Sequence, residues 1–161
     1  MMDANPSCAD ADGSTTGEPP ISEEGARQAM IAHAAATGTA IRERLGTTLD
    51  HAQLAALLED SAAVRFPVRL VFDAGPLQPG ELAYPVPMGG NPANGYIMYV
   101  HPALAERPAD TVAAVVYALV VVNYGEAASG EVGEVFGAAV LGMERDDYYR
   151  TMCRIADHLI Q

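Results

Sequence analysis

Basic residues are scarce in this sequence. Lys and Arg together number 9 of 161 residues, against 21 Asp and Glu, which gives a formal net charge of −12 at pH 7. Binding to nucleic-acid phosphates needs Lys and Arg concentrated on one surface, and no stretch of the chain is rich in them. The composition therefore predicts no nucleic-acid partner. We attribute the acidity to solubility, because net charge bears on association and not on fold.

Cysteine is nearly absent, and so is a targeting signal. The two cysteines, Cys8 and Cys153, cannot form a disulfide framework or a cysteine-based metal site. The N-terminus has neither a basic start nor an apolar stretch, so it does not read as a signal peptide, and a cytoplasmic location is expected. Its acidic, Ser-, Gly- and Pro-rich composition predicts a disordered tail over 1–20, followed by a single α+β domain over 21–161.

The sequence has only one long hydrophobic run. It extends from Asp110 to Glu126 and reads DTVAAVVYALVVVNYGE. Its apolar part, 111–124, is shorter than the roughly 20 residues that a membrane-spanning helix needs, so no membrane span is expected. Valine-rich content favours a strand. However, Asp110 is suited to cap a helix, Gly125 is suited to end one, and the run is too long for a typical strand. The sequence therefore predicts a helix that is buried on all sides.

Helices are also expected at both ends of the chain. Ser22 is suited to cap one helix that ends at Gly46, and Thr48 to cap the next. After the central run, Ser129 is suited to cap a helix reading SGEVGEVFGAAVLGM. The last helix, ERDDYYRTMCRIADHLI, has an apolar stripe at helical spacing: Tyr149, Met152, Cys153, Ala156, Leu159 and Ile160.

Three strands are predicted between these helices. Apolar and polar residues alternate over 64–73, which is typical of a half-buried strand. A second strand, 81–87, contains Pro85 and Pro87, which cannot donate ladder hydrogen bonds, so it is expected at a sheet edge. A third strand, 96–101, is apolar on both faces, which predicts cover on both sides. The fold class is therefore α+β, with a small, three-stranded, mostly antiparallel sheet packed with helices.

The segment 64–143 combines three strands, a buried helix and a further helix ending in VFGAAVLGM. This order resembles the minimal zincin core, and within that group the ImmA/IrrE-type metallopeptidases. In those enzymes a sheet strand lines the cleft, a buried helix bears H-E-x-x-H, and a helix reading roughly E-A-N-x-F-A-x-x-L-L supplies the third zinc ligand. Phe136, Ala138 and Leu141 are similar to the second half of that motif. The resemblance covers about half of the chain and implies a zincin-like topology.

The residues that perform catalysis in that family are replaced here. Placed on H-E-x-x-H, the stretch YALVV puts Tyr117 and Val121 at the two histidines and Ala118 at the glutamate, while the third ligand falls at Val132. Valine cannot bind a metal ion, and alanine cannot accept a proton from water. The resemblance therefore implies a zincin-like fold with no metal, no cofactor and no catalytic residue of this kind.

Four polar residues are our candidates for a binding site at the expected cleft: Tyr117, Tyr124, His101 and Glu131. His101 ends the strand that would line the cleft, and Tyr117 would hydrogen-bond within it or simply pack. Glu131 and Glu134, three residues apart, are expected on a solvated helix face and not as a catalytic pair. The sequence has no G-x-S-x-G elbow and no phosphate-binding G-x-x-x-x-G-K.

Three functions remain open. The first is a non-catalytic, zincin-like domain that binds another protein or a second copy of itself. The second is an adaptor or secretion-chaperone-like dimer, which the small size and acidity fit, although three consecutive C-terminal helices do not. The third is an enzyme with an unfamiliar site built from the four candidate residues.

Overall fold

The structure, a computed structural model, describes residues 22–160. Their helices and strands confirm the α+β class, while the predicted tail, 1–20, lies outside the described residues. The helices are α2 (Glu23–Leu45), α3 (His51–Leu58), α4 (Pro108–Tyr124), α5 (Gly130–Leu141) and α6 (Arg145–Ile160). The strands are β1 (Val68–Phe72), β2 (Ala83–Pro87) and β3 (Tyr96–Val100).

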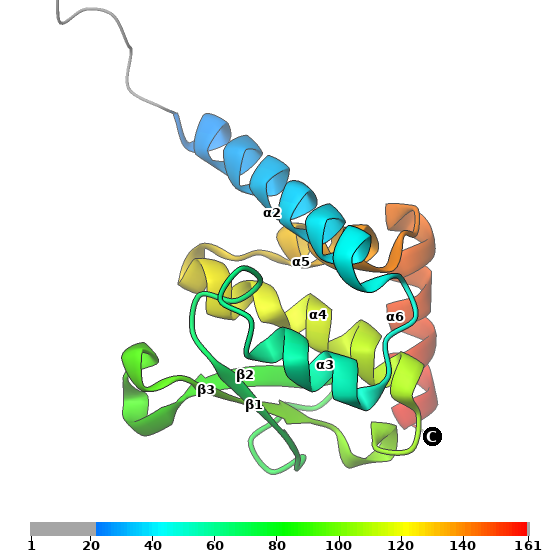
Figure 1. Ribbon diagram of the computed structural model, residues 1–161. Helices are drawn as coiled ribbons and strands as arrows, with labels where there is room; N and C mark the ends of the chain where they lie inside the picture. Colours follow the sequence, from blue (N-terminus) through cyan, green and yellow to red (C-terminus); the bar gives the residue numbers. More distant parts are fainter. Residues whose placement is uncertain (1–21, 161) are drawn as a thin grey trace, which may run out of the picture.

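The helices are stacked on one face of the sheet (Figure 1). α3 and α4 lie directly on the strands, α5 packs on the other side of α4, and α2 packs on α5. α6 runs beside α4 and α5 and reaches down toward the sheet. This arrangement places α4 at the centre, in contact with strands on one side and with helices on the others.

The sheet is mixed, with strand order β1-β3-β2. β2 pairs antiparallel with β3, and β1 pairs parallel with β3. We expected mostly antiparallel pairing, and the sheet instead has one pair of each kind because β3 inserts between β1 and β2. β2, which contains Pro85 and Pro87, lies at an edge of the sheet as predicted. Backbone groups on the outer side of an edge strand have no partner strand, so the missing proline N–H groups remove no ladder hydrogen bond there.

Strand β3 is covered by helices on one face only, so the expectation of cover on both faces is wrong. Tyr96, Met98 and Val100 point toward the helices and are buried, whereas Ile97 and Tyr99 are half-buried on the other face. Their neighbours on that face include Tyr84 and Val86 of β2, which are 42% and 37% exposed. Sheets with antiparallel pairs can leave one face without a covering layer. The apolar side chains on that face of β3 are therefore only half-buried.

Helix α4 is the core of the molecule, as the hydrophobic run predicts. Pro108 occupies its first turn, where the missing N–H costs nothing, and the helix ends at Gly125. The expected N-cap, Asp110, is wrong, because the helix starts at Pro108 and its N-cap is Arg107. Asp110 lies inside the first turn and forms ion pairs with Arg107 at 2.6 Å and Arg154 at 3.4 Å.

The helical segment Pro108–Ala127 is, by length and composition, apolar enough to cross a membrane. In this structure its side chains pack between the sheet and α5, and 61% of its most apolar window is buried inside the protein. Such burial is typical of the central helix of a folded domain. The absence of a membrane partner stays a prediction.

The predicted cap of the first helix is confirmed, and the predicted cap of the second helix is wrong. Ser22 caps α2, since its hydroxyl accepts from the Gly25 N–H at 2.9 Å. The cap of α3 is Asp50, not Thr48. Asp50 and Gln53 form a reciprocal capping box, with bonds of 2.8 and 3.0 Å, which satisfies two backbone donors at once.

Candidate functional site

A pocket of about 400 Å³ opens beside α4, and we call it the α4–α6 pocket. Most of the side chains around it are apolar. Its lining comes from β2 and the preceding loop, from α4, from the start of α5 and from α6: Gly80, Glu81, Leu82, Ala83, Tyr84, Ala114, Tyr117, Ala118, Val120, Val121, Ala128, Ser129, Gly130, Glu134, Tyr149, Met152, Cys153 and Ala156.

The α4 side of this pocket coincides with the positions that the zincin resemblance assigns to catalysis. Tyr117, Ala118 and Val121 all line it. The fourth aligned position, Val132, does not line it and is only 1% exposed within the core. The α5 residues that line the pocket are Gly130 and Glu134.

Tyr117 is held against α5 by two glycines. A Cβ at Gly133 would lie 3.0 Å from the Tyr117 carbonyl oxygen and 3.1 Å from its ring carbons Cδ2 and Cε2. A Cβ at Gly130 would lie 3.1 Å from the phenol oxygen. Burial, together with the nearby Glu134 carboxylate, raises the pKa of Tyr117, so the phenol keeps its proton. It is a hydrogen-bond donor at the pocket and not a base.

Helix α6 supplies another wall, in a rotation that differs from the predicted one. The buried residues of α6 are Tyr148 and Ile155, whereas Tyr149 and Cys153 are exposed. The expected stripe was therefore wrong at Tyr149 and Cys153, and it omitted Tyr148 and Ile155. Two adjacent tyrosines fit an apolar stripe equally well in sequence, and only the glycine opposite them decides which is buried.

That glycine is Gly137 of α5. A Cβ there would lie 2.3 Å from the Cζ and Oη atoms of Tyr148, so only glycine admits the ring. The Tyr148 hydroxyl donates to the Ala113 carbonyl oxygen of α4 at 2.7 Å. Burial raises the pKa of Tyr148 well above its ordinary value. Tyr148 thus fastens α6 to α4 and α5 and turns Tyr149 toward the pocket.

Tyr149 and Cys153 lie one turn apart at the exposed end of the pocket. The neighbouring Cys153 side chain is the main cause that raises the pKa of Tyr149. Cys153 has no disulfide partner among the described residues. The pair gives this end of the pocket a polar edge around an aromatic ring.

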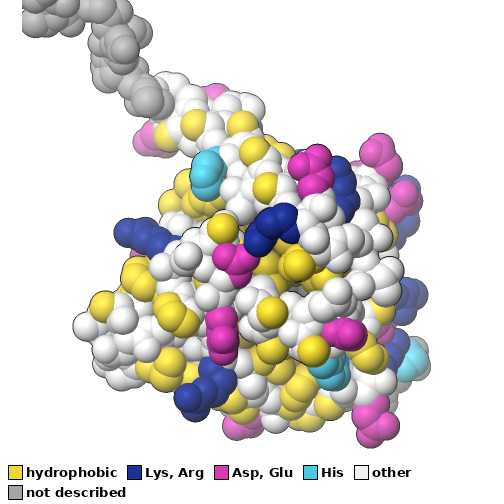
Figure 2. All heavy atoms as spheres, in the orientation of Figure 1, with side chains coloured by type: hydrophobic (Ala, Val, Ile, Leu, Met, Phe, Trp, Pro, Cys, Tyr) yellow, Lys and Arg dark blue, Asp and Glu magenta, His cyan; other side chains and the backbone are white. Residues whose placement is uncertain are grey.

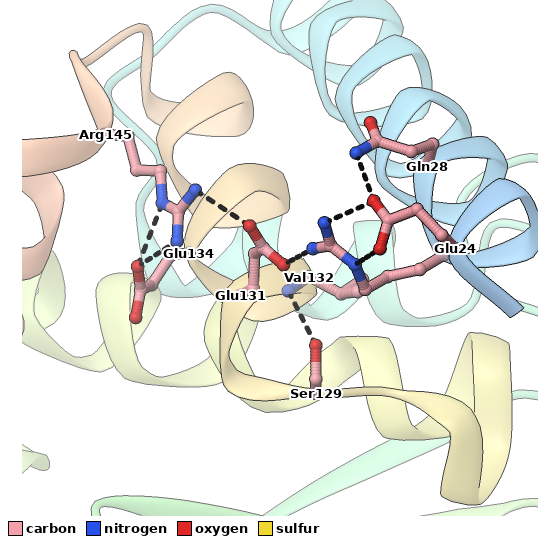
Figure 3. Close-up of polar contacts among 8 residues, drawn as sticks. Glu24, Gln28, Ser129, Glu131, Val132, Glu134 and Arg145 are labelled. Carbon is pink, nitrogen blue, oxygen red and sulfur yellow. Dashed lines mark hydrogen bonds and ion pairs between the residues drawn. The ribbon is translucent and has the colours of Figure 1, made fainter.

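A chain of ion pairs runs from α2 across α5 to α6 (Figure 3). Arg27 bonds to Glu24 at 2.7 Å and also to Glu131. Arg145 bonds to Glu131 at 3.4 Å and to Glu134 at 2.9 Å. The two glutamates are therefore only partly solvated, and both are neutralised by arginine. Each Arg pKa is raised chiefly by hydrogen bonds to these glutamates and Glu24.

The four candidate residues do not form one site. Only Tyr117 lines the α4–α6 pocket. Tyr124 shares a 2.6 Å hydrogen bond with His33 of α2, and Glu131 belongs to the ion-pair chain. His101 caps the short helix Pro102–Leu104, where its Nδ1 accepts from the Ala103 N–H at 3.1 Å.

The strand beside the pocket also differs from expectation. β3, which His101 follows, is the central strand, and β2 lines the pocket instead. The pocket is also lined by residues that the sequence did not predict for a site: Tyr84, Glu134, Tyr149 and Cys153. One available signal was the spacing of Gly130, Gly133 and Gly137, which marks the face of α5 where tyrosines approach closely.

Metal binding has no obvious donor set in the part of the chain that the structure describes. Over residues 22–160 there is no group of three or more His, Cys, Asp and Glu side chains placed to hold a metal ion. No family model, curated protein or solved structure matches the chain.

Proposed function

We propose that this protein is a non-catalytic binding domain of zincin-like topology, which accepts an apolar group of a partner protein in the α4–α6 pocket. The supporting observation is the place of that pocket. It lies over Tyr117, Ala118 and Val121, where the resemblance puts a catalytic centre. Side chains that cannot carry out hydrolysis occupy these positions.

The chemistry of the lining favours binding over catalysis. Ala118 and Val121 offer no proton acceptor and no metal ligand. Tyr117 holds its proton because its pKa is raised by burial. Glu134 is tied to Arg145 at 2.9 Å, so its charge is already compensated. What remains for a ligand is apolar contact and a small number of hydrogen bonds.

The size and rim of the pocket fit a protein partner. Its volume of about 400 Å³ falls in the usual range of about 300 to 1,000 Å³ for binding pockets. Three large apolar residues are markedly exposed in the described part of the chain, and one of them, Tyr149 of α6, borders this pocket, whereas the side chains of Tyr84 and Val86 lie on the open face of the sheet. An exposed aromatic residue beside an apolar depression is typical of the residues that dominate protein–protein affinity.

A displayed peptide library selected against the purified protein tests this proposal. We expect enriched peptides to share a large apolar residue. Ala118→Phe, which fills the pocket, and Tyr149→Ser, which removes an exposed rim residue, are each expected to weaken binding by about tenfold or more. Val86→Ser is the matched control, because Val86 is exposed but does not line the pocket.

Two kinds of result would overturn the proposal. The first kind concerns binding: the selection enriches no peptide, or peptide binding survives both pocket variants. The second kind concerns catalysis: the purified protein contains stoichiometric zinc, or it has proteolytic activity that a chelator abolishes.

A further inference from the structure

The sheet face that points away from the helices carries side chains in two rows, and each row crosses β1, β3 and β2 in turn. The first row is Arg69, Ile97 and Val86, and the second row is Val71, Tyr99 and Tyr84. We call these residues the open-face patch. Tyr84 is 42% and Val86 is 37% exposed, and Figure 2 shows hydrophobic side chains along the lower border of the molecule, where the sheet lies. Contiguous apolar side chains on a surface are typical of a site that binds another molecule.

Arg69 is the only charged residue of the open-face patch, and it is exposed. Within residues 22–160 no carboxylate forms an ion pair with Arg69, whereas carboxylates neutralise most of the other arginines: Arg27, Arg44, Arg107, Arg145, Arg150 and Arg154. The carboxylates at the ends of the β1–β2 loop, Asp73 and Glu81, accept from N–H groups of that loop at 2.8 and 2.7 Å. The patch therefore offers apolar contact together with one positive charge that has no carboxylate partner in the described part of the chain.

The open-face patch has the dimensions of one helix. Strands of five residues are about 17 Å long, and the two outer strands of a three-stranded sheet are about 10 Å apart. A helix of three turns is about 16 Å long and about 10 Å across. Sheet faces pack against helices or against a second sheet, and a second sheet of ordinary size would extend beyond three strands this short. A single helix therefore covers the patch.

We propose that an amphipathic helix of a partner protein docks on the open-face patch, with acidic residues along one flank of its apolar stripe. The stripe packs on the apolar residues of both rows, and an acidic side chain forms a charge-assisted hydrogen bond with Arg69. The same surface of a second copy is a poorer fit, because it brings two Arg69 side chains into one interface and no carboxylate of the patch. Only Tyr84 of the patch also lines the α4–α6 pocket, so this proposal does not depend on the proposed function.

Two synthetic helical peptides with the same leucine stripe, one flanked by glutamate and the other by lysine, test the proposal. Fluorescence anisotropy measures their binding to the full chain. The net charge of −12 by itself favours the lysine peptide, so a preference for the glutamate peptide requires a local positive group. We expect the glutamate peptide to bind about tenfold more tightly than the lysine peptide.

Point variants locate the binding surface. Arg69→Glu is expected to reverse the preference between the two peptides, and Val86→Ser to weaken the glutamate peptide by about fivefold or more. Arg150→Glu makes the same charge change on α6 and is expected to have no effect. Ala118→Phe, which fills the α4–α6 pocket, is also expected to have no effect, so a failure of this proposal is distinguishable from a failure of the proposed function. Circular dichroism checks that each variant is folded.

Three results would overturn the proposal. Neither peptide binds at about 1 mM protein, the lysine peptide binds as tightly as the glutamate peptide, or Arg69→Glu and Val86→Ser leave binding unchanged. Self-association in sedimentation experiments that Val86→Ser abolishes would also overturn it, in favour of a second copy as the occupant.

Discussion

Replacing Gly137 by alanine tests how α6 is held in place. The added Cβ would lie 2.3 Å from two atoms of the Tyr148 ring, which is far inside van der Waals contact. Tyr148 is fully buried, and its hydroxyl donates to the Ala113 carbonyl at 2.7 Å. The ring cannot shift without losing this hydrogen bond and its packing, so we expect Gly137→Ala to destabilise the protein.

Three contributions set the magnitude. Overpacking a core costs about 1 to 3 kcal/mol, and breaking a buried hydrogen bond costs about 1 to 3 kcal/mol. Alanine is favoured over glycine within a helix by about 1 kcal/mol. Taking the middle of each range gives a loss of about 3 kcal/mol in the free energy of unfolding.

Urea unfolding followed by circular dichroism measures this loss. With a slope of about 2 kcal/mol per molar urea, the midpoint should fall by about 1.5 M. A double-mutant cycle with Tyr148→Leu is the control, because the penalty of Gly137→Ala should shrink when the ring is absent. Stabilisation by Gly137→Ala, or the same penalty in both backgrounds, would refute the close contact between Gly137 and Tyr148.

Three further predictions follow from other contacts. Because burial raises the pKa of Tyr148 well above 10.0, the unfolded chain loses that proton first, so stability is full below about pH 10 and falls as pH rises above it. Tyr148→Phe should flatten the dependence of the urea midpoint on pH between 9 and 11, and an unchanged slope would contradict this. Asn123 accepts from the Arg65 N–H at 2.8 Å and donates to the Ala63 carbonyl at 3.0 Å, so Asn123→Ala should cost about 1 to 3 kcal/mol in unfolding experiments. Asn123→Asp, which keeps the acceptor, should cost less, and equal losses would argue against the bond to Arg65. Arg145→Gln should cost less than about 1 kcal/mol, because the ion pairs of Arg145 are largely exposed, and the loss should vanish in high salt. A larger, salt-independent loss would show that Arg145 acts through packing.

The elements of the fold were largely predictable, because they depend on local patterns. The hydrophobic run that ends before Gly125 predicted α4, and Ser22 marked the start of α2. Proline in β2 gave its edge position. The errors at Thr48 and Asp110 concern caps, where several residues suit the same role and the surrounding backbone decides among them.

The candidate site was predictable only in part. Tyr117, which lines the pocket, was a candidate because the zincin resemblance places it at the first histidine of H-E-x-x-H. Tyr124, His101 and Glu131 are equally polar in sequence, but their side chains are engaged with His33, with a local backbone N–H and with two arginines. Which polar group faces a pocket depends on neighbours that are distant along the chain.

By itself, the sequence determined the α+β class and the central buried helix. Each of these depends on residue type and on spacing of a few positions. The tertiary structure alone decided that β3 runs between β1 and β2, and that Tyr148 is buried while Tyr149 borders the pocket. These outcomes depend on which helices and strands pack against one another. Those elements are distant along the chain, so local sequence patterns do not decide which of their side chains become buried.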